Sequence, residues 1–120
     1  MIKIYKNNRG YKSTKDAMNW LDNYFLDYEV IKIRDLTLER FIHMLSLSEH
    51  GFEDFIIASE RGNELKKKFD YETMTTKEMI NFLIENQSFL KSPIIYDDRK
   101  LLIGWSEDDA RVFLPGIRIY

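Results

Sequence analysis

Cysteine is missing from this sequence of 120 residues. Without it the chain can form no disulfide bond, no thiolate metal site and no thiol nucleophile, so cysteine redox chemistry is excluded. A zinc ion would have to be held by the two histidines, His43 and His50, with carboxylates, and neither histidine lies in a recognisable ligand pattern. We therefore expect no bound metal and no cofactor.

An excess of one charge and a long apolar run are also missing. Eighteen basic residues oppose twenty acidic ones, so the net charge of −2 provides no basic field for direct binding of nucleic acid. The uncharged apolar runs are far shorter than the roughly 20 residues of a membrane span. Met1–Tyr5 lacks the apolar core of a signal peptide. We expect a cytoplasmic protein without membrane contact.

Proline and glycine are scarce, with two and five residues, which excludes collagen-like and low-complexity chains. What is present is a hydrophobic fraction of 44% that includes eight phenylalanines, enough to bury a core. The length suits one domain, which we assign to residues 1–120.

Short apolar and alternating segments predict four strands, and apolar residues spaced three and four apart predict helices. Hydroxyl side chains are the expected helix N-caps. Trp20, Tyr24, Tyr28 and the phenylalanines are expected in the core. The expected strands are Ile2–Tyr5, 28–33, Ile94–Tyr96 and Lys100–Ile103, with a further strand or tail at 117–120. The expected helices are 14–25, 38–45, 61–69, 76–86 and 107–114, capped by Thr14, Thr37, Thr75 or Thr76, and Ser106.

The order of these elements predicts an α/β fold. A strand, helix and strand at the start form a parallel pair with a right-handed crossover. The late hairpin, closed by Asp97-Asp98-Arg99, adds two antiparallel strands. The result is a four-stranded mixed sheet with flanking helices and a helical insertion at about residues 36–90.

From Phe89 onward the sequence resembles a known family. Apolar and polar pairs precede Pro-Ile-Ile, an acidic turn follows, the next strand ends in Gly-Trp, and a helix ends in Phe-Leu-Pro. This order is similar to that of the arsenate reductase (ArsC)/Spx family. The segments that carry the resemblance are Ile2–Tyr5, Ala17–Leu21, Glu49–Gly51 with Ile56–Ile57, Phe89–Asp97, Leu101–Trp105, Glu107–Asp108 and Phe113–Pro115.

The resemblance implies a thioredoxin-like fold in which the bond before Pro93 is cis. It also implies redox cysteines in the loop before the first helix, and an arginine immediately before the proline. Here the nearest loop positions are Gly10 or Tyr11 and Ser13 or Thr14. A serine or threonine hydroxyl is barely ionised at neutral pH and cannot form a disulfide. With Ser92 in place of the arginine as well, we expect no arsenate reduction and no enzymatic activity.

Spx members of the family regulate transcription by binding the C-terminal domain of the RNA polymerase α subunit, and the resemblance implies this partner here. The matching partner surface centres on Gly51, which as a residue after a helix is also expected to be a C-cap with positive φ. The residues expected to bind the partner are Gly51, His50, Glu49, Arg61, Tyr11 and Lys12.

Two other interpretations remain open at this point. The chain could be a degenerate ArsC-family scaffold that binds another protein, or an enzyme that works at the same loop without a thiol. The basic residues around that loop are read either as a solvated face or as a surface for an anion or acidic partner. They are Lys3, Lys6, Arg9, Lys12 and Lys15.

Overall fold

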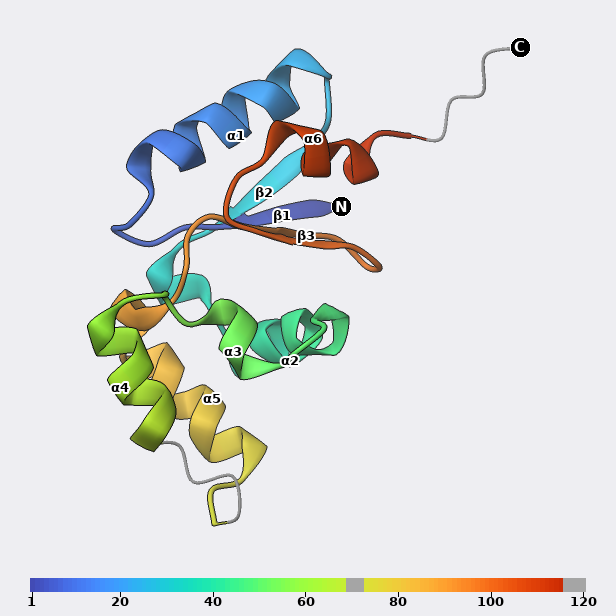
Figure 1. Cartoon of the computed structure of the whole chain (residues 1–120). Helices are drawn as coiled ribbons and strands as arrows, with labels where there is room; N and C mark the ends of the chain where they lie inside the picture. The colour runs from blue at the N-terminus through green and yellow to red at the C-terminus, as the bar shows by residue number, and fades with distance from the viewer. Residues whose placement is uncertain (69–72, 116–120) are drawn as a thin grey trace.

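A four-stranded mixed sheet forms the centre of the molecule (Figure 1), as expected. The computed structural model describes residues 1–68 and 73–115. The strand order is β2-β1-β3-β4; β1 pairs parallel with β2, and β3 pairs antiparallel with both β1 and β4. The strands are β1 (Ile2–Tyr5), β2 (Tyr28–Ile31), β3 (Ile94–Tyr96) and β4 (Leu101–Ile103).

Helices cover both faces of the sheet. In Figure 1, α1 and α6 lie above it and α2 to α5 lie below it. Three short 3-10 turns, η1 to η3, complete the regular structure of the described residues. The elements are α1 (Tyr11–Asn23), η1 (Ile33–Asp35), α2 (Leu38–Leu47), α3 (Phe52–Phe55), α4 (Glu60–Lys68), α5 (Thr76–Glu85), η2 (Gln87–Phe89), α6 (Glu107–Ala110) and η3 (Arg111–Phe113).

The alternation of side chains along the strands separates two hydrophobic clusters. Ile4 and its β3 partner Ile95 pack on the side of α1 and α6, together with Trp20 and Leu21. Tyr5, Ile94 and Tyr96, which alternate with Ile4 and Ile95 along the strands, pack on the opposite side against helices α2 to α5. Because successive side chains of a strand point to opposite faces, one short sheet holds both layers.

The hydroxyl N-caps of the later helices are confirmed. Thr37 Oγ1 accepts a hydrogen bond from the backbone N–H of Arg40 at 3.2 Å. Of the two alternatives for α5, Thr75 is the cap, accepting from the N–H of Glu78 at 3.1 Å. The Ser106 hydroxyl caps α6 in the same way.

The prediction that Thr14 caps the first helix is wrong. The helix begins three residues earlier, at Tyr11, and its N-cap is Gly10 with φ of 63°. The N–H of Thr14 already donates to the carbonyl of Gly10 at 2.8 Å, so Thr14 lies inside the first turn. Tertiary contacts of the preceding loop, described below, decide this boundary.

The far end of α1 also departs from the expected pattern. Tyr24 and Phe25, expected in the core, are 48% and 94% exposed. The helix ends at Asn23, and Phe25 adopts a positive φ of 56°. The spacing of three and four holds only while the backbone stays helical, so Phe25 leaves the buried face, whereas Trp20 inside the helix is buried as expected.

Two other boundaries differ, because Ile33 begins η1 instead of extending β2, and the last predicted helix divides into α6 and η3. The strand or tail expected at 117–120 lies outside the described residues, as does position 69 of the predicted 61–69 helix. No helix within the described parts of the chain is long and apolar enough to cross a membrane.

Candidate functional site

The loop before α1 is packed against the segment that contains Pro93. The Ser92–Pro93 peptide bond is cis, as the resemblance implied. A Cβ atom built on Gly10 would lie 2.3 Å from the carbonyl oxygen of Ser92. The N–H of Asn7 donates to the Ser92 hydroxyl at 3.2 Å. Glycine is therefore the N-cap of α1, because the backbone of Ser92 leaves no room for a side chain at this position.

Two amides that the sequence analysis did not single out hold this loop in place. The Asn7 side-chain amide donates to the carbonyl oxygens of Gln87 and Leu90, at 3.0 and 3.1 Å. The Tyr5 hydroxyl donates to Gln87 Oε1 at 2.8 Å. Burial raises the pKa of Tyr5 to about 12, although a hydrogen bond from Asn7 opposes the shift. In the sequence, Asn7 and Gln87 are marked only by their place beside buried strand and turn residues. Their hydrogen bonds join residues some 80 positions apart.

The four positions of the vestigial redox loop have different environments. Gly10 is the helix cap, Tyr11 is 82% exposed, Ser13 is half-buried and Thr14 is buried. Among the described residues the Thr14 hydroxyl has no hydrogen-bond partner. Neither the Ser13 nor the Thr14 hydroxyl supplies the ionised nucleophile that thiol chemistry requires at neutral pH.

Replacing Thr14 by valine is expected to stabilise the protein by about 1 kcal/mol, because it removes a buried hydroxyl that has no partner while keeping the branched shape. The measurement is the free energy of unfolding in urea. Thr37→Val is the matched control and should lose about 1 kcal/mol, because the Thr37 hydroxyl caps α2. A loss of stability in Thr14→Val would show that its hydroxyl is hydrogen-bonded after all.

The turn at Gly51 forms the second part of the candidate site. Its φ of 70° confirms the expected positive value. Its expected place as the C-cap of the preceding helix is wrong: Ser48 is the C-cap of α2, and Gly51 is the N-cap of α3. The N–H of Gly51 donates to the Ser48 hydroxyl at 3.1 Å. A Cβ built on Gly51 would meet no atom within 4 Å, so this side of the turn is open.

His50 is held in this turn by Asp54. The backbone N–H of His50 donates to Asp54 Oδ2 at 2.9 Å, and its ring Nδ1 lies 3.2 Å from Oδ1. Burial raises the pKa of the Asp54 carboxyl, but the hydrogen bonds from His50 outweigh it and bring the pKa below its ordinary value. The ionised carboxylate thus favours the conformation of the turn.

The contribution of Asp54 to stability is expected to depend on pH. Because its pKa is lower in the folded state, the contribution is complete above the unfolded-state pKa of about 3.9 and disappears as the pH falls through the folded value. Urea unfolding of the wild type and of Asp54→Asn between pH 3 and 6 measures it. The advantage of the wild type should shrink below about pH 4; an advantage that stays constant over this range contradicts the prediction.

The segment Lys91–Ser92 lies between the two parts of the site. Ser92 contacts the loop at Gly10, while Lys91 lines a hollow of about 340 Å³ together with Ser48 and Glu49. Tyr11 lines a different hollow, on the other side of the loop. Partner atoms that reached from Gly10 to Glu49 would therefore cross Lys91–Ser92.

The remaining predicted site residues are on the surface. Glu49, His50 and Lys12 are exposed. The guanidinium of Arg61 lies over the ring of Phe89, 5.1 Å from its centroid, a distance at which cation–π attraction acts. In residues 1–68 and 73–115, no group of three or more histidine, aspartate or glutamate side chains is placed to hold a metal ion.

Comparison with known proteins places this architecture in a family. A profile of the ArsC family matches residues 4–113. The chain belongs to the ArsC family. The global transcriptional regulator Spx of Streptococcus mutans serotype c is 34% identical over 106 residues, which cover 86% of this chain and 76% of that protein. The Spx regulator of Streptococcus pneumoniae strain R6 is 33% identical over 107 residues, covering 86% and 78%.

Two solved structures share the fold of this chain. A solution structure of a protein from Staphylococcus aureus COL superposes with a TM-score of 0.72 at 24% identity, covering 93% of this chain and 97% of that one. Arsenate reductase from Vibrio cholerae has a TM-score of 0.54 at 17% identity, covering 82% and 85%. The thioredoxin-like α/β fold expected from the resemblance is thereby confirmed.

Proposed function

We propose that this chain is a transcription regulator of the Spx kind, which binds the C-terminal domain of the RNA polymerase α subunit without a redox step. The observation that carries the proposal is the 34% identity over 106 residues with the Spx regulator of Streptococcus mutans. The absence of cysteine from all 120 positions supports a regulator that does not respond to thiol oxidation.

The Gly51 turn is the proposed centre of the partner surface. Its open side and lack of a side chain let a partner approach the backbone closely. Because Asp54 holds His50 and Gly51 is the N-cap of α3, the turn is preorganised, and little conformational entropy is lost on binding. Lys91 and Ser92 extend the surface from this turn toward Tyr11 and Lys12.

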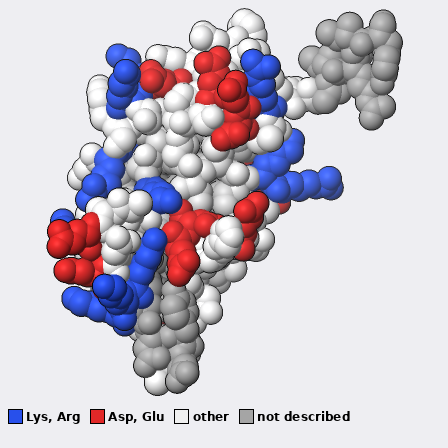
Figure 2. Space-filling view, viewed as in Figure 1, with Lys and Arg blue, Asp and Glu red and all other residues white. Residues whose placement is uncertain are grey.

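The charges on this surface would orient the partner rather than attract it from a distance. Glu49 and Glu53 are exposed near the turn, and Lys91 lines the adjacent hollow. Figure 2 shows acidic and basic side chains interspersed over this view, with no field of one sign across it. Such a surface suits a protein partner with a matching pattern, in which charges at the edge of the contact, including Arg61, set the association rate and register.

We also propose that the chain has no arsenate reductase activity. The loop positions nearest the family's cysteines hold Gly10 or Tyr11 and Ser13 or Thr14, and Ser92 precedes the cis proline where the family has an oxyanion-binding arginine. Arsenate turnover supported by a thiol donor such as glutathione would contradict this part of the proposal.

The proposed function is tested by calorimetric titration of the chain with the purified C-terminal domain of the α subunit. Saturable one-to-one binding is expected, with the same Kd in reducing and in mildly oxidising buffer. The N-terminal domain of the α subunit is the control and should not bind. Absence of binding would remove the polymerase as a partner and leave the degenerate-scaffold interpretation in its place.

A further inference from the structure

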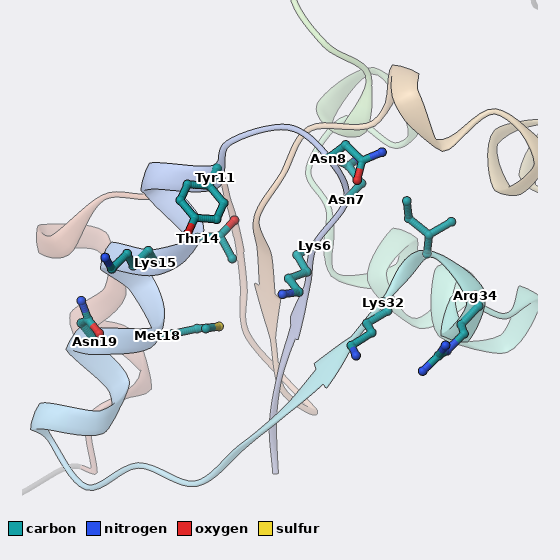
Figure 3. Close-up of a pocket in the computed structure, with 11 residues that line it drawn as sticks. Lys6, Asn7, Asn8, Tyr11, Thr14, Lys15, Met18, Asn19, Lys32 and Arg34 are labelled. Carbon is teal, nitrogen blue, oxygen red and sulfur yellow. The ribbon is translucent and has the colours of Figure 1, made fainter.

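A second hollow, of about 870 Å³, lies on the other side of the vestigial loop, between α1 and η1. Figure 3 shows the residues that line it, contributed by the loop after β1, by α1 and by the segment after β2. The hollow is therefore at the carboxyl ends of the parallel pair β1 and β2. Its volume falls in the range of sites for small organic molecules, roughly 300–1,000 Å³, and far exceeds that of a single inorganic anion.

The lining carries a concentrated positive charge. Lys6, Lys15, Lys32 and Arg34 line the hollow, and none of the described residues that line it is acidic. Lys6 and Lys32 direct their ammonium groups into the space between α1 and β2 (Figure 3). Since the whole chain has a net charge of −2, this concentration does not follow from composition.

The four cations have no ion-pair partner among the described residues. In residues 1–68 and 73–115 none of them forms an ion pair. A neighbouring carboxylate, Asp35, accepts a hydrogen bond at its Oδ2 from the backbone N–H of Lys32 at 3.4 Å, not from a cationic side chain. Like charges gathered in one hollow repel one another, and a bound anion with several charges relieves that repulsion.

Two features of α1 add to the preference for an anion. Thr14, in the wall of the hollow, is 6% exposed, and its hydroxyl has no partner in the described part of the chain. Its side chain projects from the side of α1 that faces the strands (Figure 3). The hollow also flanks α1 from Tyr11 to Asn19 and so includes its first turn, where the helix dipole is positive.

The rest of the lining suits a flat, partly apolar group. Met18 and Ile33 contribute apolar surface, and Figure 3 shows Met18 pointing from α1 into the same space. The Tyr11 ring stands at the rim and is 82% exposed. Aromatic and aliphatic groups of this kind stack on the face of a heterocyclic base.

We propose that this hollow binds a nucleoside di- or triphosphate, whose phosphates lie among Lys6, Lys32 and Arg34 and whose base packs against Tyr11 at the rim. No bond is made or broken. The hollow shares Tyr11 with the proposed polymerase surface, but Lys6, Lys32 and Arg34 are not part of that surface, which centres on the Gly51 turn and the other hollow. Loss of ATP binding in the Lys32 and Arg34 variant therefore tests this site apart from polymerase binding.

The probe is ATP, measured by calorimetric titration beside inorganic tripolyphosphate and adenosine. ATP should bind tightest, tripolyphosphate about tenfold more weakly, and adenosine not measurably, with affinity falling as salt is raised. Lys32→Ala/Arg34→Ala should weaken ATP binding about tenfold or more. Lys67→Ala/Lys68→Ala on α4 changes the net charge equally and should leave the affinity for ATP unchanged.

Two further variants separate the parts of the site. Tyr11→Ala should weaken ATP about threefold to tenfold and leave tripolyphosphate unaffected. Thr14→Val should weaken both ligands a few-fold although the free protein becomes more stable. The proposal is overturned if ATP does not bind, if both double variants weaken it equally, or if a poly-glutamate peptide binds tighter than ATP, which would assign the hollow to an acidic protein segment.

Discussion

Gly51→Arg is expected to lower the affinity for the C-terminal domain of the RNA polymerase α subunit by about a hundredfold or more, while the protein still folds. The structure shows open space where the new side chain would begin, so the arginine would project toward the partner and would not clash with its own chain. A contact that depends on close approach to the Gly51 backbone would be sterically blocked.

Gly51→Ala is the matched control, because it imposes the same backbone strain without the bulk. Gly51 has φ of 70° and ψ of −138°, a conformation that residues with a Cβ rarely adopt, so both variants should lose about 1–3 kcal/mol of unfolding free energy. The alanine variant should retain most of the affinity. If both variants lose the same stability and bind the C-terminal domain with equal affinity, Gly51 has a conformational role only.

Gly10→Ala is expected to have the largest effect on stability, about 3 kcal/mol or more. Its φ of 63° already disfavours alanine, and the new Cβ would overlap the Ser92 carbonyl oxygen at 2.3 Å. Relief requires the loop to move away from Ser92, which would break the hydrogen bond between Asn7 and the Ser92 hydroxyl. Unfolding in urea measures the loss.

Gly104→Ala isolates the contribution of this overlap. Gly104 also has a positive φ, of 81°, but a Cβ there would meet nothing within 4 Å. Gly104→Ala should lose only about 1–2 kcal/mol of unfolding free energy, the cost of the left-handed conformation alone. Equal losses in the two variants would mean that the loop and the Ser92 segment are not in close contact.

The hydrophobic pattern was sufficient to predict the sheet. Ile2–Tyr5 is predicted as a strand because Ile2 and Ile4 alternate with Lys3, and Ile94–Tyr96 because it is a short apolar run; the structure places the two strands side by side. Thr37 was predictable as a cap, and Thr75 as one of two alternatives, because each hydroxyl bonds an N–H three residues away. Such signals are local, so a single sequence carries them.

The start of α1 was not predictable in this way. A threonine before an amphipathic segment is an ordinary helix signal, and it favoured Thr14 as the cap. The actual cap, Gly10, is selected by the carbonyl of Ser92, more than 80 residues away in the chain. The Asn7 and Gln87 amides were not predictable for the same reason, because their hydrogen bonds join the loop to η2 across a similar separation in the chain.

The sequence by itself determined which chemistry this chain lacks, because a chain without cysteine has no thiolate wherever its residues lie. It also determined the strands and most helix caps, which depend on neighbours within a few residues. Only the tertiary structure decided that Lys32 and Arg34 join Lys6 and Lys15 around one hollow, and that Lys91–Ser92 lies between the vestigial loop and the Gly51 turn. These groupings depend on the crossover between β1 and β2 and on the return of the chain through the sheet, which bring together residues that no local pattern connects.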